Sequence, residues 1–150
     1  MDYTKKVLNK VLVNLFNNIY VIEEKTLKSG PISDLSLTEI HTIEAIGMYV
    51  PRSMSEIAQD LNITVGTLTS AINKLIKKGY VIRKRIEEDR RVVLVTCTKK
   101  GKLAYRLHRK FHSDMVNETI REIPKEDQEI LIKALTGLNE YFINKYKLNR

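Results

Sequence analysis

Lysine and arginine side chains are the residues best suited to chemistry in this 150-residue chain, and they are concentrated in one segment. Residues 74–110 contain 14 of them and only three acids, which gives this segment a net charge of +11. The other 113 residues carry 12 basic and 15 acidic side chains, so the total charge of +8 conceals a nearly neutral body. The basic segment predicts an anionic partner, and by itself leaves nucleic acid, an acidic protein and an anionic membrane open.

Residues 64–77 have the pattern of a helix that reads DNA. Apolar side chains at 65, 68, 72 and 75 form one face, and the opposite face carries small hydroxyls, an amide and two ammonium groups. Small residues let a helix approach DNA closely, asparagine can pair with an adenine edge, and lysine meets phosphate or guanine. The DNA contacts predicted on this helix and the short helix before it are Ser53, Ser55, Thr64, Gly66, Thr67, Thr69, Ser70, Asn73, Lys74 and Lys77.

A second DNA contact is predicted at a polar turn between two strand-like runs, 81–86 and 91–98. Arg90 and Arg91 lie at this turn, where a guanidinium can enter a narrow minor groove or bridge phosphates. Asp89 repels DNA, so we expect its carboxylate to hold an arginine in place.

The elements that must position these residues are mostly helical. Helices are expected at 5–27, from 37 to about 49, 54–61, 64–78, 99–121 and 125–146, and Ser-x-x-Glu capping boxes begin at Ser36 and Ser53. Two short helices followed by a basic hairpin predict a mainly α fold with a small β-hairpin wing, the winged helix-turn-helix. The side chains expected to face inward in its helices are Leu37, Ile40, Ile43, Ile46, Ile57, Ala58, Leu61, Val65, Leu68, Ile72 and Leu75.

The long helices at the two ends carry apolar stripes that a small domain cannot easily cover. The stripes run through 7–22, through Leu103, Leu107, Phe111 and Met115, and through 130–146. We therefore expect one domain over 1–150, with a DNA-binding lobe at about 36–98 and dimerisation helices at about 5–27 and 99–146. A two-fold homodimer predicts a palindromic DNA site.

Other signals narrow the functional class. A single cysteine, Cys97, excludes an internal disulfide. The sequence shows neither a signal peptide nor an 18-residue apolar run, so a cytoplasmic protein is expected. No phosphate loop, nucleophile elbow or His-Glu-x-x-His sequence is present, so no enzymatic activity is expected. The rival interpretation from another class is an adaptor that binds an acidic protein or a membrane surface without DNA.

The chain resembles the MarR family of winged-helix transcription regulators. The resemblance is carried by residues 54–61, 64–75 and 78–81, and by Asp89-Arg90-Arg91 followed by Thr98-Lys99-Lys100-Gly101. It implies a homodimer held by its terminal helices, a recognition helix at 64–77 and a wing arginine at Arg91 oriented by Asp89.

Four scattered segments, 17–24, 40–47, 89–93 and 106–112, are similar to the FabT-type subgroup of that family. This resemblance implies a repressor of fatty-acid-synthesis genes, with acyl-acyl carrier protein as its corepressor. The alternative within the family is a regulator that responds to another small ligand or to an oxidant.

Because carrier proteins are acidic, the subgroup resemblance also implies a docking role for basic residues after position 98. The residues assigned to effector or carrier-protein docking are Lys102, Arg106, Arg109, Lys110, His41, His108 and His112.

Two further possibilities rest on single features. His108 and His112 have the i, i+4 spacing that can chelate zinc, but two histidines are a weak signal, and we expect neither a metal nor a cofactor. Cys97 follows a wing strand, and a peroxide-sensing role for it is not favoured.

Overall fold

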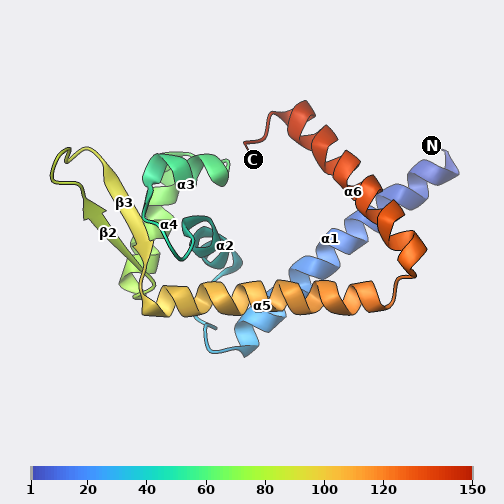
Figure 1. Ribbon diagram of the computed structural model, residues 1–150, viewed down its shortest axis with the longest axis horizontal. Coiled ribbons are helices and arrows are strands. Elements are labelled where there is room, and N and C mark those ends of the chain that lie inside the picture. Colours follow the sequence, from blue (N-terminus) through green and yellow to red (C-terminus); the bar gives the residue numbers. More distant parts are fainter. Residues whose placement is uncertain (1, 150) are drawn as a thin grey trace. The chain divides into compact units, whose positions relative to one another are not determined.

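The computed structural model describes residues 2–149 and divides into two compact units, one ending at Leu37 and the other beginning at Thr38. The first unit is dominated by the helix α1 (Tyr3–Ser29). The second contains most of α2 (Leu37–Ile46), then β1 (Arg52–Ser53), α3 (Met54–Asp60), α4 (Val65–Lys77), β2 (Val81–Arg85), β3 (Val93–Cys97), α5 (Lys99–Arg121) and α6 (Lys125–Tyr146) (Figure 1). The expected fold class is confirmed.

In the first unit, α1 is two residues longer at each end than the sequence predicted. The loop that follows had no recognisable pattern, and a lysine side chain stabilises it: Lys28 Nζ donates to the carbonyl oxygens of Ser33 (3.3 Å) and Leu35 (3.1 Å). Much of the apolar stripe of α1 is exposed, including Val11 and Phe16.

The helix-turn-helix core of the second unit is built by the predicted apolar faces. Ile40, Ile43, Ile57, Leu68, Ile72 and Leu75 are fully buried. The capping box at Ser53 is confirmed, because its hydroxyl accepts from Glu56 N and Glu56 Oε2 accepts from Ser53 N. Two inward assignments need correction: Leu61 is only half-buried and Val65 is 46% exposed. Val65 is the first residue of α4, where the helix has not yet reached the core.

Helix α2 ends earlier than expected. The sequence predicted a helix to about Tyr49, but α2 stops at Ile46 because Gly47 takes a positive φ of 77°. Glycine adopts this conformation without steric cost and so ends helices readily.

The β-hairpin forms as predicted, and a third strand joins it. Strands β2 and β3 pair antiparallel, with Val81 opposite Cys97 and Arg85 opposite Val93. The two-residue β1 pairs with the other edge of β3, giving the order β1-β3-β2. Two residues are too few to show an alternating pattern, so the sequence predicted only two strands.

A close backbone contact joins the sheet to α5. Thr98 caps α5 by accepting from Gly101 N (3.2 Å), and its own hydroxyl donates to the carbonyl oxygen of Gly79 (2.7 Å). Gly101 packs against the backbone of Tyr80 so closely that a Cβ atom there would overlap the Tyr80 carbonyl oxygen. The Thr-x-x-Gly sequence is thus explained by packing at the base of the hairpin.

The apolar stripes of the last two helices are only partly covered in the single chain, and Leu107, Phe111 and Met115 of α5 are half-buried. On α5 the buried positions are Gly101, Ala104 and His108, whereas Leu103 is 43% exposed. No residue of α6 is buried among those the structure describes. None of the helices in residues 2–149 is long and apolar enough to cross a membrane.

Candidate nucleic-acid interface

The outer face of α4 presents the polar side chains that the sequence assigned to DNA. Gly66, Thr67, Ser70, Asn73, Lys74 and Lys77 are all exposed. The buried face at Leu68, Ile72 and Leu75 fixes the helix rotation, so these polar residues point away from the core.

Several predicted hydroxyl contacts have a structural role at the start of α4. Thr64 Oγ1 accepts from Thr67 N (3.2 Å) and lies 2.9 Å from Thr67 Oγ1, which caps the helix. Thr69 Oγ1 donates to the Val65 carbonyl oxygen at 2.8 Å. These hydroxyls therefore shape the helix end, and any DNA contact they make is additional to that role.

Ser53 and Ser55 lie at the start of α3. The Ser53 hydroxyl belongs to the capping box and is half-buried, whereas Ser55 is exposed. Ser55 is thus the more accessible of the two to a bound ligand.

The wing holds its arginine by an ion pair with the neighbouring aspartate. Arg91 Nε lies 3.1 Å from Asp89 Oδ1, and Arg91 Nη2 lies 3.4 Å from Oδ2. The hydrogen bonds from the Arg91 side chain and from its backbone N–H lower the pKa of Asp89. The Arg91 side chain is 93% exposed, so the ion pair holds in place a guanidinium that is open to solvent.

A hollow of about 810 Å³ lies between the starts of α3 and α4 and the wing. Arg83, Arg85 and Arg91 line it together with Met54 and Val65, and further lining residues are Ser53, Ser55, Thr69, Val92 and Val93. The sequence analysis missed Arg83 and Arg85, although their spacing of two places them on one face of a strand. The hollow thus joins helix and wing into one cationic surface.

Part of the basic segment is used inside the fold. Lys78 Nζ pairs with the buried Glu39 carboxylate at 2.7 Å. Lys100 Nζ donates to the Lys78 carbonyl oxygen at 2.9 Å and lies 4.2 Å from the centre of the Tyr80 ring. These two lysines stabilise the junction below the wing, so the charge of +11 overstates what is offered to a partner.

The basic residues assigned to docking on α5 are mostly exposed. Arg106, Arg109 and Lys110 are exposed and Lys102 is half-buried. Arg109 contacts the Tyr105 hydroxyl (3.2 Å), which raises the pKa of that guanidinium, and Lys110 pairs with Asp114 at 2.6 Å.

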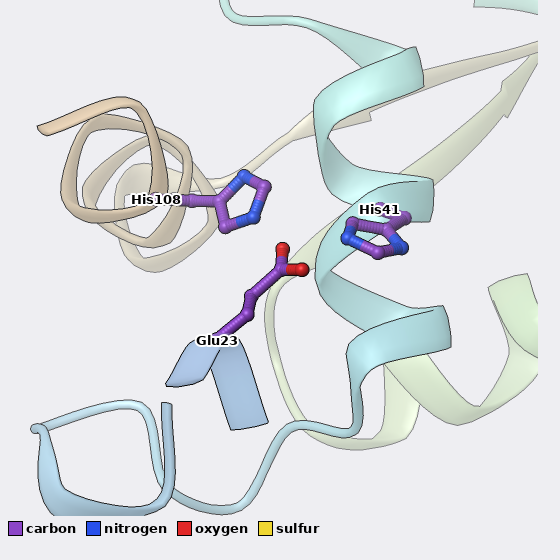
Figure 2. Close-up of side chains that lie close together, drawn as sticks. All are labelled: Glu23, His41 and His108. Carbon is purple, nitrogen blue, oxygen red and sulfur yellow. The ribbon is translucent and has the colours of Figure 1, made fainter. Parts of the chain in front are cut away.

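The three histidines assigned to docking come together in the second unit. The ring centres of His41 and His108 lie 5.4 Å apart, and those of His108 and His112 lie 4.5 Å apart. Figure 2 shows the His108 ring, from α5, and the His41 ring, from α2.

Cys97 is a poor candidate for a reactive thiol. Its side chain is buried, and burial raises its pKa to about 11, partly opposed by the charge of Lys102. Because the thiolate is the reactive form, this environment disfavours oxidation chemistry.

Comparison with known proteins decides the family. The chain is 40% identical to the FabT protein of Streptococcus pneumoniae, whose crystal structure was solved in complex with DNA; the match covers 95% of this chain and 99% of that one, with a TM-score of 0.89. The profile of the MarR family also matches residues 35–93. The chain belongs to the MarR family. It is therefore a MarR-type DNA-binding transcriptional regulator and not an enzyme.

More distant relatives agree with this assignment. The regulator PchR of Bacillus subtilis is 24% identical over 91% of this chain and 88% of its own length. A MarR protein of Peptoclostridium difficile shares the fold, with a TM-score of 0.75 and 23% identity over 93% of this chain and 89% of that one.

Proposed function

We propose that this MarR-family chain is a homodimeric repressor of fatty-acid-synthesis genes that binds a palindromic operator. The observation that carries the proposal is the 40% identity to S. pneumoniae FabT over 95% of the chain. The match includes both the DNA-facing elements and the helices expected to bind the effector, and its identity of 40% separates it from relatives such as the MarR protein of P. difficile, which is 23% identical and shows the fold alone.

On DNA, each protomer places the exposed face of α4 in a major groove. Asn73 and Lys74 are on that face, where an amide or ammonium can reach base edges. Arg91 and the arginines of β2 lie against the flanking backbone or minor groove, with Asp89 holding Arg91 in position.

A homodimer accounts for the exposed apolar surface of the terminal helices. Exposed apolar side chains occur on α1, as at Val11 and Phe16, and on α6, as at Leu131 and Leu135. Apolar side chains that recur along the exposed side of a helix are typical of a protein interface. Two-fold symmetry would then present two recognition helices to two half-sites.

Acyl-acyl carrier protein is the effector that we propose, acting as corepressor. The support is the subgroup resemblance together with the exposed Arg106 and Arg109, whose charge suits an acidic protein. A ligand can switch the dimer only by binding the operator-competent arrangement more tightly than the other one.

A gel-shift experiment tests the proposal. The promoter of a fatty-acid-synthesis gene should be shifted by the protein, and long-chain acyl-acyl carrier protein should tighten this binding. The unacylated carrier protein should not, because the acyl chain is the signal. Failure of the protein to bind any such promoter would contradict the repressor assignment, whereas tightening by a different small ligand would favour the alternative within the family.

The carrier-protein contact is tested separately with Arg106→Glu/Arg109→Glu. We expect this variant to bind the operator alone as the parent does and to lose the response to acyl-acyl carrier protein. Arg121→Glu, an exposed position at the far end of the same helix, is the matched control and should keep the response. An unchanged response in the double variant would remove α5 from the docking surface.

A further inference from the structure

The loop between α2 and β1, residues 47–51, carries two exposed apolar side chains next to each other. Tyr49 is 85% exposed and Val50 is 69% exposed. Single apolar residues are common on protein surfaces, but an adjacent pair that includes a tyrosine is less ordinary. Tyrosine is one of the residue types that are enriched at the centres of protein interfaces. The 47–51 loop is therefore a candidate contact surface.

The 47–51 loop is held firmly at its base. Arg52, the first residue of β1, donates from Nη1 to the Ala45 carbonyl oxygen and to Asp60 Oδ2, each at 2.7 Å. Its side chain thus ties the end of α2 to the end of α3 across the loop. Within the loop, Gly47 has a positive φ and the ring of Pro51 restricts its own φ. A loop that is ordered before binding loses little conformational entropy when a partner covers it.

The basic part of α5 lies beside this loop. Arg106 Nη1 is 3.8 Å from Met48 Sδ, so the loop and the helix are in contact. Arg109, less than one turn further along α5, lies over the Tyr105 ring at 5.8 Å from its centre. Tyr105 is the main cause of the raised pKa of the Arg109 guanidinium, and Tyr49 also contributes to it. Two exposed arginines therefore border the exposed tyrosine.

This surface is cationic and contains few acids. No aspartate or glutamate occurs in residues 45–52 or 99–113, whereas the second range contains six lysines and arginines. The acids next to these ranges already face basic groups: Asp114 pairs with Lys110 at 2.6 Å, and the charge of Glu44 acts on Arg109. Arg106 and Arg109 are exposed, so their charge is available to an acidic partner.

The composition favours a protein partner over DNA. An apolar and aromatic centre bordered by arginines is typical of protein–protein interfaces. DNA backbones are instead contacted through charged and polar groups, which leaves no role for an adjacent tyrosine and valine. The hollow between the starts of α3 and α4 and the wing includes neither Tyr49 nor Arg106 in its lining. The loop surface is thus separate from the candidate nucleic-acid interface.

We propose that Tyr49 and Val50 form the apolar centre of a docking surface for an acidic protein, with Arg106 and Arg109 as its cationic border. The partner that we assign to it is acyl-acyl carrier protein, so this inference rests on the proposed function and adds the 47–51 loop to the two arginines. The loop leads directly into β1 and Ser53, the N-cap of α3. A partner docked there lies next to the start of the helix-turn-helix.

The first test measures direct binding of fluorescently labelled long-chain acyl-acyl carrier protein to the full-length protein by anisotropy. Tyr49→Ala should weaken binding by about 10-fold or more, the usual effect of truncating an aromatic side chain at the centre of an interface. Tyr49→Phe keeps the ring and should bind nearly as the parent does. Tyr3→Ala removes a tyrosine of similar exposure (80%) at the start of α1 and is the matched control, with parental binding expected.

The second test asks whether the partner is acidic. Val50→Asp and Val50→Lys both replace the apolar side chain with a charged one. Val50→Asp should weaken binding of the carrier protein much more than Val50→Lys, because only the aspartate repels an acidic protein. Circular dichroism establishes that each variant is folded, and Tyr49→Ala should bind operator alone as the parent does.

The outcomes separate this inference from the proposed function. If the parent binds the carrier protein and Tyr49→Ala binds it equally well, the loop is not part of the docking surface, and the effector proposal stands. Equal losses in Val50→Asp and Val50→Lys would exclude an acidic partner at the loop. Weaker binding of operator alone by Tyr49→Ala would assign the loop to the DNA surface instead. Absence of carrier-protein binding by the parent would overturn both the effector proposal and the docking surface, whereas operator binding would still support the repressor.

Discussion

At the scale of single residues, charge and close packing decide what each side chain can do. Asp89 is acidic within a basic surface, and its position is explained by the two hydrogen bonds that fix the Arg91 side chain. Gly101 has no side chain because the Tyr80 carbonyl oxygen occupies the space where a Cβ atom would lie.

Removal of the Arg91 guanidinium should lower the affinity of the protein for DNA. We expect Arg91→Ala to weaken operator binding by about 10- to 100-fold, since an arginine contact to DNA contributes about 1–3 kcal/mol. The matched control is Arg121→Ala, an exposed arginine at the end of α5. Fluorescence anisotropy with labelled operator measures both, and parental affinity in Arg91→Ala would refute the wing assignment.

Asp89→Asn keeps the shape of the side chain and removes its charge. The variant should bind operator more weakly than the parent, because Arg91 loses the anion that orients it. The ion pair lowers the pKa of Asp89, so its carboxylate stays ionised at neutral pH and its effect is lost only as the pH falls through that lowered pKa. Between pH 8 and pH 6, the pH dependence of operator affinity should therefore be the same in the parent and in the Asp89→Asn variant.

A methyl group at position 101 should destabilise the fold. Gly101→Ala forces a Cβ atom into the Tyr80 backbone and against Cys97 Cβ, and we expect a loss of about 1–3 kcal/mol, or about 3–10 °C in Tm. Gly66→Ala is the matched control for stability, because a Cβ atom there approaches nothing closer than 3.9 Å. Thermal unfolding followed by circular dichroism compares the two, and equal Tm values would show that the contact at Gly101 relaxes without cost.

At the scale of elements, the candidate nucleic-acid interface is formed by short helices and strands that stabilise one another. An isolated hairpin is marginal in water, and here it gains β1 on its open edge and the α5 junction at its base. Strand β2 therefore has a fixed rotation, and Arg83 and Arg85 line the hollow beside α4.

The two faces of β2 should differ in their effect on DNA binding. We expect Arg83→Gln/Arg85→Gln to weaken binding and to reduce the slope of log affinity against log salt by about one for each phosphate that is no longer neutralised. Lys84→Gln changes the same charge type on the residue between them, which does not line the hollow. Titrations at several salt concentrations distinguish the cases. If Lys84→Gln has half the effect of the double arginine variant, the loss depends on net charge alone and not on the surface formed by Arg83 and Arg85.

At the scale of the whole molecule, the exposed apolar helices connect assembly with DNA affinity. Helix α6 has no buried residue among those described. Its apolar side chains would be exposed to water in a single chain, which is unfavourable. Dimerisation would cover this surface and place two recognition helices on one operator.

Charge on the apolar surface of α6 should therefore reduce both assembly and binding. Leu131→Asp/Leu135→Asp should shift the protein towards monomer in sedimentation and weaken operator binding by about 10-fold or more, because one protomer cannot use both half-sites. Lys133→Asp, a polar position on the same helix, is the control for added charge. A double variant that stays dimeric would exclude this part of α6 from the interface.

The sequence by itself determined the features that depend on local order. Helix periodicity, the capping box at Ser53, the Thr64 cap and the β-rich runs around the turn are all short-range signals, and the helix-turn-helix with its wing followed from them. The concentration of charge in residues 74–110 was equally visible, and it predicted an anionic partner.

Only the tertiary structure decided which distant residues meet. Pairing of β1 with β3, the hollow shared by Val65 and the β2 arginines, and the approach of His41 to His108 join residues that lie from 18 to 67 positions apart. Spacing along a chain carries no information about such contacts, because they depend on how whole faces pack. That is why two histidines one turn apart were a weak signal in the sequence, whereas the structure shows that the His41 ring lies beside that of His108.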